Sequence, residues 1–145
     1  MKKNIYFITL LFFTLFSFTA CEEKGEPRIF VEPKLTVPIR CMKLNTLGSD
    51  EALVERLKKL YTFSDRCDLT LTLSTKKDIV CNSPQNPMDK AYGKFPRSYI
   101  KLDLRRGIEL QYSYYVDLYS NVDEDDVEEG FERLKKDLIV SKGVE

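Results

Sequence analysis

Histidine is absent from all 145 residues of the chain, and so is tryptophan. Without histidine, Ser-His-Asp and Cys-His catalysis in their usual forms are excluded, as are zinc sites with imidazole ligands. Without tryptophan, a sugar-binding platform built on that residue is excluded. An excess of either charge is also lacking, because 23 basic residues balance 23 acidic ones. The chain therefore has no electrostatic footprint for nucleic acid, and we expect no nucleic-acid partner.

What the sequence does contain is a long apolar run at its start. Lys2 and Lys3 precede an uncharged stretch from Ile5 to Phe18, and the small residues Thr19 and Ala20 follow. This is the order of regions in a secretory signal. The run of about 14 residues is too short to span a bilayer comfortably, because about 20 are needed. The segment therefore predicts export of the protein.

A cysteine, Cys21, stands directly after Phe-Thr-Ala, and this arrangement resembles a bacterial lipoprotein signal. The resemblance implies that residues 1–20 are removed and that Cys21, then the N-terminus, carries lipid such as palmitate. The residues 22–24 (Glu-Glu-Lys) are similar to the charged stretch of surface-exported lipoproteins of the Bacteroidota. A lipid-anchored outer-membrane protein is implied, on either the periplasmic or the cell-surface side. The alternatives are an ordinary cleaved signal with Cys21 as a bystander, and a polar spacer without sorting information.

Removal of residues 1–20 leaves 125 residues, with 21 basic and 23 acidic side chains, because the removed part contains only two lysines as charges. This length supports one domain with a real hydrophobic core. Residues 21–34 contain charges, a glycine and two prolines without periodicity, which predicts a flexible tether. We therefore expect a single domain over 35–140 and a frayed tail over 141–145.

The first half of this domain predicts a strand, a helix and two further strands. Residues 35–44 alternate in polarity, and Pro38 places that strand at a sheet edge or delays its pairing. Ser49 is the expected N-cap of an amphipathic helix that ends near Thr62. Residues 67–74 alternate cleanly and predict a half-buried strand. A short partner strand is expected over 79–81.

The second half predicts a loop, a hairpin and a helix. Residues 82–97 hold three of the six prolines and predict a long irregular connection. Strands over 100–104 and 108–118 follow, and a three-residue loop pairs Leu104 with Ile108. This loop puts Gly107 at the position that needs a positive φ. Asp123 is predicted to cap a final amphipathic helix.

This order of elements, β-α-β-β-β-β-α, predicts an α+β fold. Strands that are apolar on one side and two amphipathic helices favour a two-layer sandwich, with both helices on one face of a five-stranded, mostly antiparallel sheet. The strand–helix–strand unit over 35–74 fits one parallel crossover.

Apart from Cys21, three cysteines remain, which allows one disulfide and one thiol. If Leu69 lies opposite Ile79, Cys67 lies opposite Cys81, so Cys67–Cys81 is the preferred pairing. The pairing Cys41–Cys67 is the second choice, and three buried thiols are the third.

Two surfaces are candidates for binding a partner. The polar face of the predicted hairpin presents Tyr99, Arg105, Tyr115 and Tyr119. Tyrosine and arginine are favoured in protein interfaces. The second surface is the acidic run that contains Asp123, Asp125 and Asp126. Either surface is alternatively a solvated face with no partner.

The same acidic run is a poor calcium loop, because Asp126 stands where such a loop needs glycine. We assign no metal or cofactor. We also assign no catalytic residue, because Cys41, Cys67 and Cys81 are predicted on apolar faces, where a thiol is inert.

We therefore interpret the protein as a lipid-anchored protein of the cell envelope that binds another protein and is not an enzyme. It would be an accessory subunit of an outer-membrane assembly. One alternative is an immunity lipoprotein that neutralises an envelope-acting toxin through the acidic run. Another is a glycan-binding protein or weak hydrolase that uses the tyrosine-lined sheet.

Overall fold

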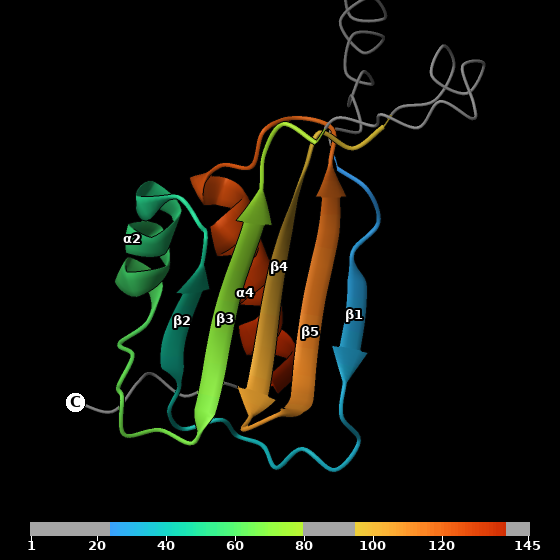
Figure 1. The fold of residues 1–145 in the computed structure, drawn as a ribbon. Helices are drawn as coiled ribbons and strands as arrows, with labels where there is room; N and C mark the ends of the chain where they lie inside the picture. The colour runs from blue at the N-terminus through green and yellow to red at the C-terminus, as the bar shows by residue number, and fades with distance from the viewer. Residues whose placement is uncertain (1–23, 80–94, 139–145) are drawn as a thin grey trace, which may run out of the picture.

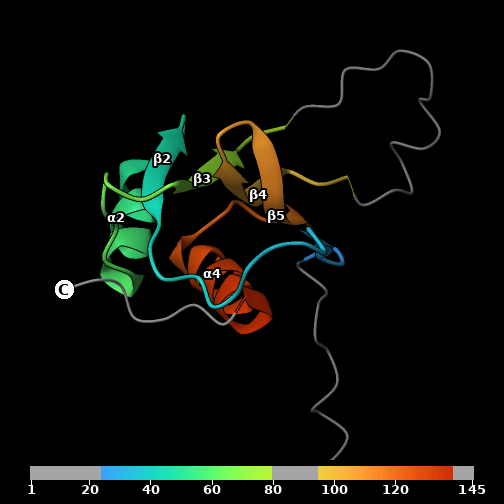
Figure 2. The same ribbon diagram turned by 90° about the horizontal axis from the view of Figure 1, so that it is seen from below.

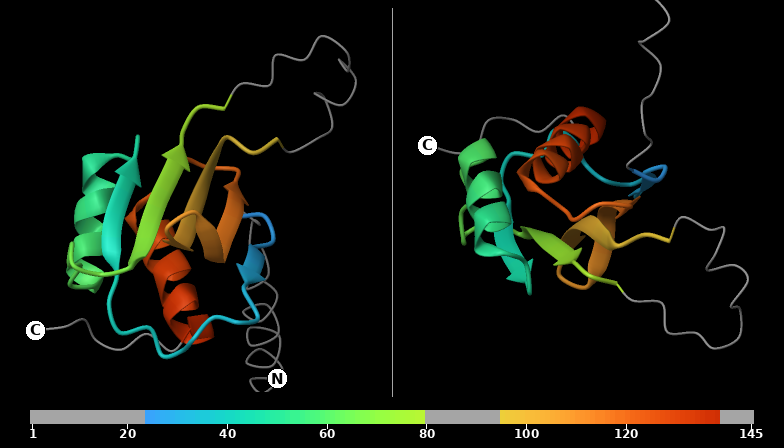
Figure 3. Two further views of the ribbon diagram at one scale, coloured as in Figure 1. Left: turned by 60° about the horizontal axis from the view of Figure 1, so that its bottom comes forward. Right: turned by 90° about the horizontal axis from the view of Figure 1, so that it is seen from above.

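The computed structural model describes residues 24–79 and 95–138, which form an α+β fold (Figure 1). A five-stranded sheet has the order β1-β5-β4-β3-β2. Both helices lie against one side of the sheet and beside each other (Figures 2 and 3). The elements are β1 (Arg28–Val31), β2 (Lys43–Leu47), α2 (Glu51–Leu60), β3 (Leu69–Lys76), β4 (Ser98–Arg106), β5 (Glu109–Leu118) and α4 (Glu124–Leu138). The predicted fold class is confirmed.

The sheet is mixed, as the sequence allowed. The strands β2 and β3 are parallel and are joined through α2, whereas the other neighbouring strands are antiparallel. A parallel pair needs a crossover of this kind, because a tight turn would reverse the chain.

The helices begin close to the predicted caps. The carboxylate of Asp123 accepts hydrogen bonds from the backbone N–H groups of Asp125 and Asp126, which confirms it as the cap of α4. At α2, however, the cap is Asp50, whose side chain accepts from the N–H of Ala52. Ser49, the predicted cap, donates its hydroxyl instead to the carbonyl of Leu73. The cap lies one residue later than predicted because Asp50, the residue after Ser49, also has a side-chain oxygen that can accept a backbone hydrogen bond.

Residues 28–31 of the predicted tether form a strand, so the prediction of a flexible tether over 21–34 was wrong. The strand β1 pairs with β5, with Arg28 opposite Tyr115 and Val31 opposite Tyr112. Lys24 forms an isolated antiparallel bridge with Leu118. A strand of four residues between two prolines is too short to show a period of two, which is why no strand was predicted there.

The fifth strand is therefore β1, and Ile79, which is the one described residue of the strand predicted over 79–81, is not in a strand. The N–H of Ile79 donates to the carbonyl of Arg97, and β3 pairs with β2 and β4. Cys81, residues 82–94 of the loop predicted over 82–97, and the tail 141–145 lie outside the described residues. The strand predicted over 35–44 begins only at Lys43, beyond the cis Val37–Pro38 bond, and it is an edge strand.

The hairpin has a two-residue loop, Gly107 and Ile108, so the predicted three-residue loop was wrong. Gly107 does have a positive φ of 60°. Without correction, this loop would place Leu104 opposite Gln111 and mix the two faces. A bulge corrects the register, because Arg105 pairs with Leu110 while Leu104 pairs with Tyr112. One extra residue on β5 thus restores the alternation.

The core lies between the sheet and the helices. Its largest fully buried side chains include Tyr112, Phe131, Leu71, Leu73, Leu102 and Leu104. The helix α4 approaches the sheet at Gly130, next to Tyr114 and Leu102. The helices of the described ranges are too short or too polar to traverse a bilayer.

Candidate functional site

The face of the sheet opposite the helices carries the predicted tyrosines. Residues that are paired across neighbouring strands project to the same side, so the register identifies which side chains share this face. We call this set the open face. Within residues 24–79 and 95–138, no helix covers it (Figure 3). Away from the bulge at Leu110 and Gln111, its members are Arg28, Phe30, Lys43, Asn45, Thr70, Thr72, Ser74, Lys76, Tyr99, Lys101, Asp103, Arg105, Ser113, Tyr115 and Asp117.

Asp103 organises the centre of the open face. Its carboxylate accepts a hydrogen bond of 2.7 Å from the hydroxyl of Ser113 and lies 2.8 Å from the Nζ of Lys101. Arg105 lies 3.6 Å away and also donates to the carbonyl of Ile108. The two cations are therefore held in place while they remain about 40% exposed, at 38% and 41%.

A second cluster is built around Tyr115 on β5. Its ring lies 5.5 Å from the ring of Tyr99 and 5.6 Å from the guanidinium carbon of Arg28. Its hydroxyl donates to Asp117 at 2.6 Å. Burial, together with this hydrogen bond, raises the pKa of Tyr115 to about 12. The phenol therefore stays neutral well above neutral pH.

Charge on the open face is predominantly positive. Five of its members are cationic (Arg28, Lys43, Lys76, Lys101 and Arg105), and two are carboxylates, Asp103 and Asp117. Both carboxylates already contact cations of the same face. Lys43 and Lys76 form no ion pair with any residue that the structure describes. These two lysines of the open face can therefore form ion pairs with an anionic partner.

The acidic run lies at the start of α4, in the helical layer, whereas the open face belongs to the sheet. The two predicted surfaces are therefore separate in the structure. Asp123 caps α4, and the carboxylate of Asp126 accepts from the N–H of Asp123. Asp126 is 5% exposed and lies 2.9 Å from the Nζ of Lys24. Partial burial lowers the pKa of Lys24, but hydrogen bonds to Glu129 and Asp126 outweigh this effect and raise it. Of the three predicted carboxylates, only Asp125 is both exposed and not used as the cap.

Tyr119, the remaining predicted residue, follows the end of β5 and is partly buried. It is not part of the open face that the strand register defines. The sequence correctly placed Tyr99, Arg105 and Tyr115 on one face, because the alternation along β4 and along the outer part of β5 is regular. It missed Arg28 and Lys43, since β1 and the start of β2 lack a clear pattern.

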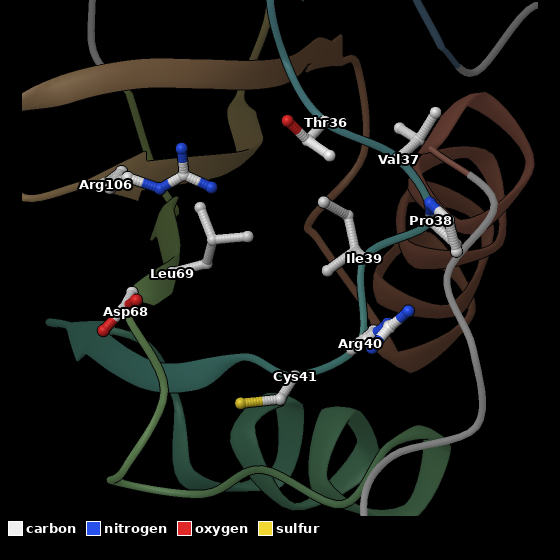
Figure 4. A pocket seen from close by; sticks show the side chains of 9 residues that line it. All are labelled: Thr36, Val37, Pro38, Ile39, Arg40, Cys41, Asp68, Leu69 and Arg106. Carbon is white, nitrogen blue, oxygen red and sulfur yellow. The ribbon is translucent and has the colours of Figure 1, made fainter.

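A cleft of about 340 Å³ lies at the end of the sheet where β3 begins and β4 ends (Figure 4). Ile39 and Leu69 form its apolar part, and Arg106 extends over Leu69. Cys41 also lines it. The sequence did not predict this cleft, because residues far apart in the chain form it. No residue of the open face lines it.

The disulfide beside this cleft joins Cys41 to Cys67, with their Cα atoms 5.7 Å apart. The preferred pairing Cys67–Cys81 was therefore wrong, and the second choice is correct. The partner strand over 79–81, on which the preferred pairing depended, does not exist at Ile79. Cys67 instead lies in the connection before β3, where the chain returns beside residue 41.

Within the two described ranges, His, Cys, Asp and Glu side chains do not gather in groups of three that could hold a metal ion. Comparison of the chain with protein-family models, with curated proteins and with solved structures finds no match. The functional argument therefore depends on the chain's own residues. The predicted lipid attachment at Cys21 lies outside the described residues.

Proposed function

We propose that this protein is anchored by lipid at Cys21 in the outer membrane of the cell envelope and binds a protein partner through its open face. The signal-like order of residues 1–21 supports the anchor. The disulfide between Cys41 and Cys67 supports a compartment outside the cytoplasm, because disulfides persist in oxidising environments. The open face supports binding.

The observation that carries the proposal is the combination of ordered aromatic rings and an excess of positive charge on one face. Tyr99 and Tyr115 are held by contact with each other, so a partner that covers them immobilises few additional rotamers. Asp103 holds Lys101 and Arg105 in place in the same way. Because cations outnumber carboxylates, complementarity favours a partner that presents an acidic surface.

The test compares two charge-reversed double variants in affinity capture of the detergent-solubilised lipoprotein, followed by mass spectrometry. The first, Lys43→Glu with Lys76→Glu, changes the open face. The control, Lys59→Glu with Lys136→Glu, makes the same charge change on exposed positions of α2 and α4. We expect the open-face variant to lose the captured partner and the control to retain it.

Two results would contradict the proposal. Retention of the partner by the open-face variant, with loss by the control, would move the binding surface to the helices. Recovery of a protein that lacks an acyl mass on Cys21 would remove the anchor. A Tyr115→Ala variant separates charge from ring contact, since it leaves all five cations of the open face in place.

A further inference from the structure

Lys24 is fixed to the domain from two sides. Its backbone bridges to Leu118 at the end of β5, and the N–H of the next residue, Gly25, donates to the carbonyl of Asp117 at 2.7 Å. Its Nζ lies 2.9 Å from Asp126 and 2.5 Å from Glu129 of α4. The sheet and a helix therefore hold the same residue, so Lys24 is part of the folded domain.

This position leaves a very short connection to the proposed lipid. Only Glu22 and Glu23 lie between Cys21 and Lys24. The three residue steps from Cys21 to Lys24 span at most about 11 Å, because a fully extended chain advances at most about 3.6 Å per residue. The tether predicted over 21–34 would reach almost 50 Å by the same rule. The domain would thus be held against the bilayer surface.

We infer that the end of the sheet at Leu118 faces the lipid headgroups and that the turn at Gly107 and Ile108 points away from them. This inference rests on the proposed lipid anchor. The strand β1 runs antiparallel to β5, so the chain enters the domain at the Leu118 end and runs toward the turn. A strand as long as β5, with 10 residues, spans roughly 30 Å.

The orientation has consequences for the two surface features. The strands of the open face would rise from the bilayer, so that a partner docks along them from the side. The cleft and the disulfide lie at the end remote from the lipid, as does Ile108, which is 92% exposed. In this orientation, the Leu118 end of the sheet lies next to the lipid surface and the opposite end does not.

The absence of tryptophan allows a direct test. A single tryptophan is introduced by Tyr119→Trp beside Leu118, or by Ile108→Trp at the turn. The acylated proteins are reconstituted in phosphatidylcholine vesicles that contain a lipid with a nitroxide on its headgroup. We expect strong quenching of fluorescence for Tyr119→Trp and, for Ile108→Trp, quenching no greater than in vesicles without nitroxide.

A spacer provides the matched control. Insertion of twelve Gly and Ser residues between Glu23 and Lys24 leaves the anchor and the domain unchanged but lengthens the connection. We expect this insertion to remove most of the quenching of Tyr119→Trp. Equal quenching at both positions, or stronger quenching at Ile108→Trp, would overturn the inferred orientation.

Intact-mass measurement separates this inference from the proposed anchor. An acylated chain with equal quenching at the two positions would leave the anchor in place and reject the orientation alone. A chain without acyl mass that fails to float with vesicles would reject both. A Cys21→Ser variant supplies the signal expected for a protein that is not attached.

Discussion

Gly130 of α4 packs against the ring of Tyr114 so closely that a Cβ at this position would lie 2.8 Å from the ring atom Cε1. The same Cβ would lie 3.2 Å from a methyl group of Leu102. Tyr114 and Leu102 are themselves paired across β5 and β4. The separation of the helix from the sheet is therefore set by the absence of a side chain at one position.

Gly130→Ala is expected to destabilise the protein by about 1–3 kcal/mol, because an added methyl group overpacks this contact. The intrinsic preference of a helix for alanine, about 1 kcal/mol, opposes the effect but does not outweigh it. Urea unfolding measures the difference. Lys136→Ala on an exposed position of the same helix is the control, and an equal response of the two variants would contradict the close packing.

Lys24→Met is expected to cost about 1–2 kcal/mol of unfolding free energy. The substitution leaves the carboxylate of Asp126, which is 5% exposed, without its cation. We use the lower part of the range because Lys24 is 39% exposed and water screens its charge. Lys59→Met, at an exposed position of α2, should leave the urea midpoint unchanged. A midpoint for Lys24→Met equal to that of Lys59→Met would show that the ion pair does not stabilise the fold.

Cys41→Ser with Cys67→Ser is expected to lower stability by about 3–4 kcal/mol. The disulfide closes a loop with a sequence separation of 26, and a loop of this length accounts for such a loss in the chain-entropy model. Cys81→Ser should retain the wild-type midpoint, since the disulfide does not include that residue. Peptide mapping without reductant should yield a linked pair that contains Cys41 and Cys67. A linked pair that contains Cys81 would refute this pairing.

Alkaline pH is expected to destabilise the protein as it rises from about 10 to about 12. Burial and the bond to Asp117 raise the pKa of Tyr115 from 10.0 to about 12. Above the lower value, Tyr115 deprotonates in the unfolded chain but not in the folded one. The contribution of Tyr115 to the free energy of unfolding is therefore complete below about pH 10 and is lost as the pH rises through about 12. Burial raises the pKa values of Tyr112 and Tyr114 as well.

Tyr115→Phe tests this assignment, because phenylalanine does not titrate. Urea unfolding across the same pH range should show a shallower loss of stability for this variant than for the wild type. Tyr119→Phe serves as the comparison, since it removes a phenol that lies beyond the end of β5. Identical slopes for Tyr115→Phe and the wild type would refute the role of Tyr115.

Local patterns predicted the fold class because the longer strands and the two helices each show a repeated spacing of apolar residues. Leu69, Leu71 and Leu73 alternate with polar residues and are buried in β3 as expected. Val127, Phe131 and Leu134 follow a helical spacing and are buried in α4. Their order allowed one sheet covered by two helices, and the helix between β2 and β3 allowed the parallel pairing that the structure shows.

The sequence by itself thus determined the buried faces of β3 and α4 and the class of fold, because burial of apolar faces is encoded at spacings of two to four residues. Only the tertiary structure decided the pairing of Cys41 with Cys67, the bulge that brings Leu104 opposite Tyr112, and the addition of β1 to the sheet. Each of these depends on which distant segments meet in space. That choice is made by the free energy of the whole packed domain, and no local pattern records it.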